Sequence, residues 1–128
     1  MWGTYVLVDT IASGKGLAGG LVVSTFVVYT DREGKYRWGF QVDNYRTIAD
    51  SGEGYDSKES CLHGIQVLKE NDGSYQAYVD PRGEHRWRFR AGNGRIIAHS
   101  AEGYVSDSNC QRAIDMVKRE AIYAHTEA

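Results

Sequence analysis

The sequence predicts an α+β fold in which two tandem β-β-β-α repeats pack as one pseudo-twofold domain. The first observation is an internal repeat in this chain of 128 residues and 14.3 kDa. Residues 26–70 align with 75–119 without a gap, at the offset of 49 that separates Trp38 from Trp87, and 18 of the 45 aligned positions are identical. The second is that each unit carries three strand-like patterns and then a helical one. A period near 50 indicates one supersecondary unit used twice.

Each repeat begins with a strand and a tight turn. Residues 26–30 and 75–79 are rich in aromatic and β-branched side chains, which favour strands. They are followed by Asp-Arg-Glu-Gly at 31–34 and Asp-Pro-Arg-Gly at 80–83. We predict type I turns there, because proline suits the second position of such a turn and glycine the fourth.

The second strand of each repeat has two different faces. In 36–42 and 85–91 the tryptophan and phenylalanine alternate with polar residues, so the aromatic side chains share one face. In the second repeat the other face carries Arg86, Arg88 and Arg90. The dipeptide Asn93-Gly94 then predicts a two-residue hairpin in which both residues take positive φ angles, leading into a third strand at 95–100.

A helix closes each repeat. Ser57 and Ser106 stand where the helices begin, and each hydroxyl can accept a hydrogen bond from an unpaired backbone amide. Apolar residues then recur at helical spacing, which gives each helix one stripe to lay on a sheet. The stripes are Cys61, Leu62, Ile65 and Leu68 in the first repeat and Cys110, Ile114, Val117 and Ala121 in the second.

The chain divides into four segments. They are an N-terminal extension at 1–24, repeat 1 at 25–71, repeat 2 at 74–121 and a tail at 122–128. Within the extension, the sequence of residues 5–8 is compatible with an additional strand. A unit of this size is marginal alone, because too little of its surface can be buried. The Asn-Asp-Gly-Ser linker is short and keeps the repeats adjacent. We therefore expect both units to bury their tryptophan faces in one shared core.

Composition excludes several classes of protein. The longest weakly polar run, 16–29, is too short for a membrane-spanning helix, and a net charge of -2 creates no overall field that attracts nucleic acid. The two cysteines lack C-x-x-C spacing, so we expect a reducing, cytoplasmic location. The histidines lack the spacing of a metal site. We predict no catalytic residue, no metal and no cofactor.

Three motifs carry a resemblance to a known family. Both repeats contain R-W-x-F, N-x-R-x-I-A and S-x-E-G-Y-x-S, within 26–119. With them the chain resembles the YegP-like family of small tandem-repeat domains. The resemblance implies β-β-β-α repeats, built as a tandem pair or as a dimer of single units, and it implies no activity because the family has no known function. Two features depart from the pattern: Arg112-Ala113 replaces His63-Gly64, and 1–24 has no counterpart.

The clearest candidate binding surface is rich in arginine. Residues 26–70 have a net charge of -2, whereas 75–119 have +3. A candidate anion-binding surface for RNA or another polyanion consists of Arg86, Arg88, Arg90 and Arg95. The structural alternative is a solvated outer sheet face, which a nearly neutral chain favours. The tryptophans and phenylalanines point to the opposite face, which counts against base stacking beside the arginines.

Two further features invite a functional interpretation. Glu53 and Tyr55 recur as Glu102 and Tyr104, in loops that we expect between the repeats. The structural interpretation is stronger, with tyrosine filling the helix–sheet junction and glutamate near the positive end of the helix. The cysteines lie one turn inside each helix, where the pKa of a thiol can be lowered, but their place in the apolar stripe favours burial.

The function that follows is a non-catalytic binding or interaction module. The alternative is RNA or other polyanion binding through the arginine face of repeat 2. A second alternative is a small enzyme with a cleft near the Glu-Gly-Tyr loops. Open edge strands would also allow pairing between chains, giving a homodimer, and no membrane partner is expected.

Overall fold

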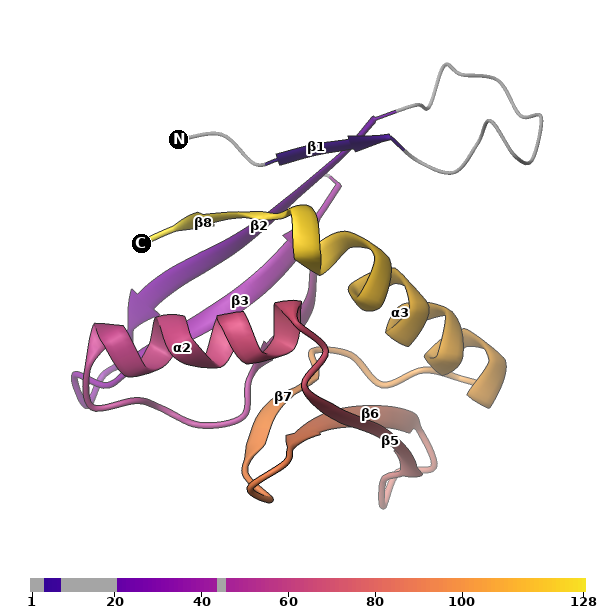
Figure 1. Ribbon diagram of the computed structural model, residues 1–128. Helices are drawn as coiled ribbons and strands as arrows, with labels where there is room; N and C mark the ends of the chain where they lie inside the picture. The colour runs from indigo at the N-terminus through magenta and orange to yellow at the C-terminus, as the bar shows by residue number, and fades with distance from the viewer. Residues whose placement is uncertain (1–3, 8–20, 44–45) are drawn as a thin grey trace.

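The computed structural model describes residues 4–7, 21–43 and 46–128 (Figure 1). These residues form an α+β fold, as predicted. The elements in chain order are β1 (Thr4–Leu7), β2 (Leu21–Thr30), β3 (Tyr36–Val42), β4 (Arg46–Ser51), α2 (Lys58–Lys69), β5 (Gly73–Val79), β6 (His85–Ala91), β7 (Ile96–Ser100), α3 (Asp107–Glu120), the 3-10 helix η2 (Ala121–Tyr123) and β8 (His125–Glu127). Within the described ranges, neither helix is long and apolar enough to cross a bilayer.

One sheet runs through both repeats. Its strand order is β1-β2-β3-β4-β7-β6-β5, and β8 pairs with β2 off this path. The three strands of each repeat are neighbours, and the repeats meet where β4 pairs antiparallel with β7. In this seam Asp50 lies opposite His99, its equivalent at the offset of 49. The arrangement is consistent with a tandem duplication.

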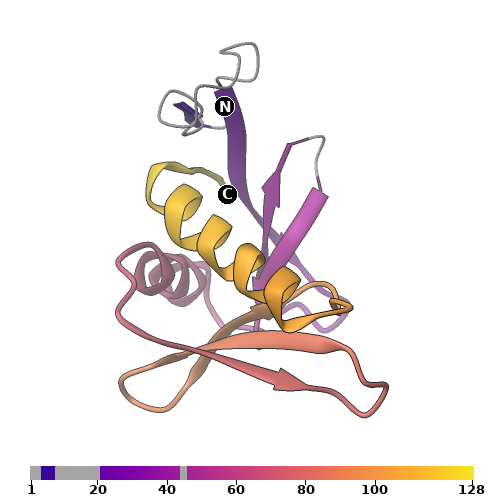
Figure 2. The ribbon, with the colours of Figure 1, turned by 90° about the vertical axis from the view of Figure 1, so that its right-hand side faces the viewer.

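The aromatic faces of β3 and β6 form a shared core. Trp38 and Trp87 are fully buried, as are Phe40 and Phe89, and residues of both repeats belong to one cluster. Each helix packs on strands of both repeats: α2 on β3 and β7, and α3 on β5, β6 and β4. The sheet curves around the two helices (Figure 2). The expected burial of both tryptophans is confirmed, and each large apolar side chain buried in this way contributes about 1.5–3 kcal/mol.

The turns after β2 and β5 are confirmed and the hairpin turn after β6 is corrected. Gly34 and Gly83 take φ angles of 79° and 85°, and their amides donate to the carbonyls of the aspartates three residues earlier. After β6 the amide of Gly94 donates to the carbonyl of Ala91 in the same pattern, and only Gly94 has positive φ. The prediction of positive φ at Asn93 is wrong, because Asn93 instead accepts a hydrogen bond from the amide of Arg95.

The starts of the helices follow the sequence, and strands also form before β2 and after α3; β1 overlaps the strand expected at 5–8, of which Val8 lies outside the described residues. The Ser57 and Ser106 hydroxyls each accept a hydrogen bond of 3.1 Å from the amide three residues on, as predicted. β1 pairs with the first half of β2, and β8 pairs in parallel with Thr25 to Val27 along the second half. The segment assigned to a tail therefore covers part of a sheet edge.

Candidate functional site

The arginine stripe of β6 divides into a paired and an unpaired part. Arg86 donates from Nε to Asp80 Oδ2 at 2.7 Å, and Glu84 Oε1 lies 3.6 Å from Arg86 Nη2. Arg88 and Arg90 make no ion pair with any described residue, and Arg90 donates to the carbonyl of Gly94 at 2.6 Å. Charge that can meet an external anion therefore lies at Arg88 and Arg90.

Tyrosine rings share the face of these arginines. The pairing of β5 with β6 places Tyr78 opposite Arg86, so both side chains point the same way. Arg88 Cζ lies 4.2 Å from the centroid of the Tyr78 ring, a cation–π contact. Tyr29, the equivalent of Tyr78 in β2, is 47% exposed and lies opposite Arg37. The tryptophans point into the core, away from the arginine face, as expected. The tyrosines supply the aromatic rings that this face was expected to lack. Period-two alternation on the neighbouring strand is the signal that locates them.

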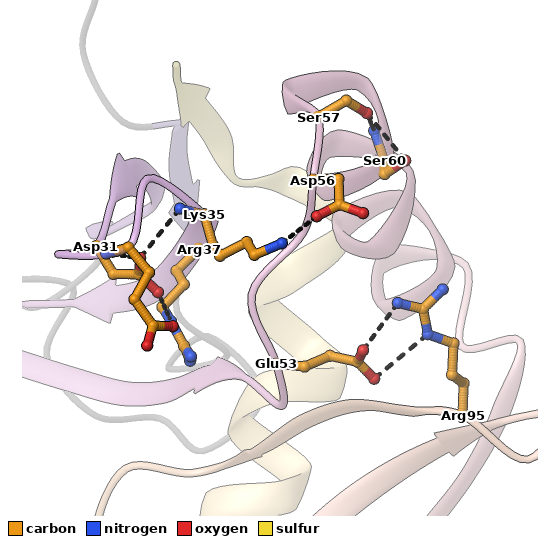
Figure 3. Close-up of polar contacts among 9 residues, drawn as sticks. Asp31, Lys35, Arg37, Glu53, Asp56, Ser57, Ser60 and Arg95 are labelled. Atoms are coloured by element: carbon orange, nitrogen blue, oxygen red, sulfur yellow. Dashed lines mark hydrogen bonds and ion pairs between the residues drawn. The ribbon is translucent and has the colours of Figure 1, made fainter.

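Arg95 belongs to a contact between the repeats rather than to this face. Its guanidinium donates two hydrogen bonds to the Glu53 carboxylate, at 2.9 and 3.3 Å (Figure 3). Arg46 binds Glu102 in the same way at 3.0 and 3.1 Å. Such bidentate pairs constrain orientation as well as distance. Arg46 was not among the predicted site residues, although it is the repeat equivalent of Arg95.

The loop tyrosines fill the junction of helix and sheet. Tyr55 is 4% exposed and Tyr104 9%, and Arg95 lies 5.5 Å from the centroid of the Tyr55 ring. Burial raises the pKa of both hydroxyls, and neither hydroxyl has a hydrogen-bond partner among the described residues. A buried tyrosine with a raised pKa stays neutral, so these side chains serve packing better than proton transfer.

A groove lies beside each of these tyrosines. The first, about 290 Å³, lies between α2 and the β6–β7 hairpin and includes His63, Gly64 and Arg95. The second, about 320 Å³, lies between α3 and β4 and includes Arg112 and Ala113. The two grooves are built from equivalent positions. The departure from the family pattern at 112–113 therefore falls in the wall of the second groove.

Both cysteines are buried and free. Burial raises the pKa of the Cys61 thiol to about 11. Burial also raises the pKa of the Cys110 thiol, with a smaller effect from Asp107. The hypothesis that the helix starts lower the thiol pKa values is therefore wrong, because a buried thiolate lacks solvation, and the expected burial of both cysteines is confirmed.

The centre of the outer face carries one further polar pair. His99 Nδ1 lies 3.1 Å from Asp50 Oδ1 across the seam. Burial raises the pKa of Asp50, and the charges of His99 and of neighbouring arginines oppose that shift. In the part of the chain that the structure describes, no group of three or more His, Cys, Asp or Glu side chains is placed to hold a metal ion.

Comparison with known proteins assigns the family. A family model described as "Domain of unknown function (DUF1508)" matches residues 31–75 and 80–127, once in each repeat. The chain belongs to the DUF1508 family. The resemblance to YegP-like proteins is thereby confirmed, and the function of the DUF1508 family is not known.

Several DUF1508 relatives match a stretch close to one repeat. A UPF0339 protein of Neisseria meningitidis serogroup B is 50% identical over 44 residues, which are 34% of this chain and 77% of the relative. A UPF0339 protein of Methanosarcina acetivorans is 49% identical over 49 residues, 38% of this chain and 83% of the relative. These lengths agree with the repeat as the unit of the family.

Two solved structures share the fold of the whole tandem pair. They are a UPF0339 protein from Shewanella oneidensis and the protein of unknown function yegP from E. coli, both with a TM-score of 0.73. The sequence identities are 19% and 23%, and the matches cover 81% of this chain and 89% and 90% of those chains. At this identity the likeness extends to the fold alone.

Proposed function

We propose that this protein is a non-catalytic binding module whose ligand is single-stranded RNA, held on the outer sheet face of repeat 2. One observation carries the proposal. Arg88 lies over the Tyr78 ring and Arg90 follows two residues on along the same face of β6, opposite the helix-covered core, and neither arginine has a carboxylate partner among the described residues. Guanidinium groups bind phosphates with favourable geometry, and aromatic rings stack on bases. Arg88, Arg90 and Tyr78 together form the arginine–tyrosine cluster.

The cluster is confined to one repeat. The equivalents of Arg88 and Arg90 in repeat 1 are Gly39 and Gln41. Arg37 is bound to Asp31 at 2.7 Å, as Arg86 is bound to its own aspartate. The positive charge of the outer face is therefore local, which fits weak, salt-sensitive binding by a chain of net charge -2.

Fluorescence anisotropy of a labelled oligouridine, measured at rising salt, tests this site. The Arg88→Gln/Arg90→Gln variant is expected to lower the affinity at low salt at least about tenfold. It should also reduce the slope of log K against log salt by about 1.4, since each phosphate contact on a single strand contributes about 0.7. The control Arg32→Gln/Lys58→Gln removes the same charge at exposed positions of repeat 1 and should leave both quantities unchanged.

Replacement of Tyr78 separates stacking from charge. Tyr78→Leu is expected to weaken binding by about 1–3 kcal/mol per stacked base while the salt slope stays as in the wild type. Equal RNA affinity in the wild type and the double arginine variant contradicts the site. If the wild-type protein binds heparin but not oligouridine, the proposal that RNA is the ligand is contradicted.

We further infer a cytoplasmic location and a pseudo-twofold relation between the repeats at 25–71 and 74–121, with 1–24 as an extension. Free thiols at both cysteines support a reducing compartment. The pseudo-twofold relation is supported by the equivalent residues that meet at the β4–β7 seam and by the two matching Arg–Glu pairs. In this arrangement the Glu-Gly-Tyr loops anchor one repeat to the other.

A further inference from the structure

The outer strand of repeat 2 has a free edge. β5 is last in the strand order, beyond β6. Its equivalent in repeat 1 is β2, whose outer edge pairs with β1 over 21–24 and with β8 over 25–27. Among the described residues nothing pairs with the outer edge of β5, which Figure 1 shows at the end of the sheet away from β8. The unpaired N–H and C=O groups of such an edge can template another strand.

β5 lacks the features that usually protect an edge. Its sequence, Gly-Ser-Tyr-Gln-Ala-Tyr-Val, contains no charge and no proline, and it pairs with β6 without a bulge. Ala77 and Val79 are exposed although they share the face of Trp87, and Val79 is 58% exposed. Natural sheets normally guard exposed edges with lysine, proline or a bulge, so this strand is suited to pairing.

We propose that β5 pairs antiparallel with β5 of a second copy of this chain, in a register centred on Gln76. Gln76 then lies opposite Gln76 of the second copy, so no charge meets a like charge within the paired strands. Directly opposite side chains determine the stability of such a pair. The remaining positions set a large side chain against a small one: Tyr75 with Ala77, Tyr78 with Ser74, and Val79 with Gly73.

The chain already contains a pairing of this kind. At the seam, β4 pairs antiparallel with β7, its own repeat equivalent, and Asp50 lies opposite His99 at the centre. In this register Asp80, which follows β5, comes opposite Asp72 of the second copy just beyond the paired segment, and Arg86 binds Asp80 and offsets its charge there. Antiparallel pairing of the two β5 strands in this register keeps the outer faces of both copies on the same side of the extended sheet. It therefore joins the two arginine–tyrosine clusters into one surface, although the dimer itself does not depend on RNA binding.

Sedimentation velocity without RNA tests the dimer. Strands of seven residues bury less than a standard interface of about 1,600 Å², so we expect association in the micromolar range, with the dimer fraction rising between about 1 and 500 µM. Gln76→Lys and Gln76→Glu each set like charges opposite one another and should remain monomeric, whereas an equimolar mixture of the two should form the dimer again. Gln111→Lys and Gln111→Glu, at an exposed position of α3, are the matched controls and should dimerise as the wild type does.

Cross-linking tests the register. Residues directly opposite one another in antiparallel strands have Cα atoms about 4.5–5.5 Å apart, which suits a disulfide. Gln76→Cys should give an oxidised dimer and Gln111→Cys should not, while the native cysteines are buried. A wild-type chain that stays monomeric up to about 500 µM overturns the proposal and leaves the edge for a strand of another protein. A dimer that survives both charge variants, or no cross-link at Gln76→Cys, overturns it as well.

Discussion

Replacing Gly64 with alanine tests how firmly the Tyr55 ring is held at the junction of α2 and the sheet. Gly64 is buried in α2, and a Cβ atom there would overlap the Tyr55 hydroxyl and lie 3.0 Å from the ring carbon Cζ. Overfilling a packed core typically costs about 1–3 kcal/mol, whereas alanine in place of glycine within a helix gains about 1 kcal/mol. We therefore expect Gly64→Ala to lower the free energy of unfolding by up to about 2 kcal/mol.

Removing the Tyr55 hydroxyl separates the cost of steric overlap from the gain in helix propensity. Tyr55→Phe alone is expected to be neutral or slightly stabilising, because this buried hydroxyl has no hydrogen-bond partner among the described residues. In the Tyr55→Phe background, Gly64→Ala meets only the ring carbon, so helix propensity dominates and the substitution should stabilise by up to about 1 kcal/mol. The coupling energy between the two positions is then about 1–3 kcal/mol.

Urea unfolding followed by the fluorescence of the buried tryptophans measures these free energies. The equivalent positions of repeat 2 provide a control, because Ala113 already carries the methyl group beside Tyr104. Ala113→Gly should cost about 1 kcal/mol through helix propensity, whether residue 104 is tyrosine or phenylalanine. Effects of Gly64→Ala and Tyr55→Phe that add within about 0.5 kcal/mol would refute the packing explanation.

Two further predictions concern buried titratable groups. Burial raises the pKa of Glu120, which is 1% exposed, so its ionised form opposes folding and stability falls as the pH rises through the raised pKa. Glu120→Gln should raise the free energy of unfolding at pH 7 and give no gain below the ordinary glutamate pKa of 4.5; urea titrations at both pH values test this, and an equal gain at both contradicts it. Cys61 and Cys110 should react with Ellman's reagent far more slowly in the native protein than in urea, and rapid labelling of the native thiols would disprove their burial.

Local structure could be predicted wherever one residue determines the backbone. The caps at Ser57 and Ser106 and the turn at Gly83 needed only a side-chain acceptor or a positive φ at a known position. The buried face of β3 and β6 followed from period-two alternation. The hairpin at Asn93 failed because the same Asn-Gly pair also fits a longer turn, in which only the glycine takes positive φ.

The rest depended on which segments meet in space. The pairing of Arg95 with Glu53 requires β4 to lie beside β7, and the repeats could join through other edges without changing any local pattern. β8 is three residues long and has no periodicity to detect. The position of Tyr78 could have been predicted, because the register of the β5–β6 hairpin determines which side chains of β5 share a face with the arginines of β6.

The parallel pairing of β8 with β2 places Thr25 opposite His125, although most of both repeats lies between them in the chain. During translation, β2 leaves the ribosome nearly two repeats before β8. The edge of β2 at Thr25–Val27 therefore lacks its β8 partner until the second repeat has emerged. Pairing of the β2 edge is therefore completed only after both repeats have been synthesised.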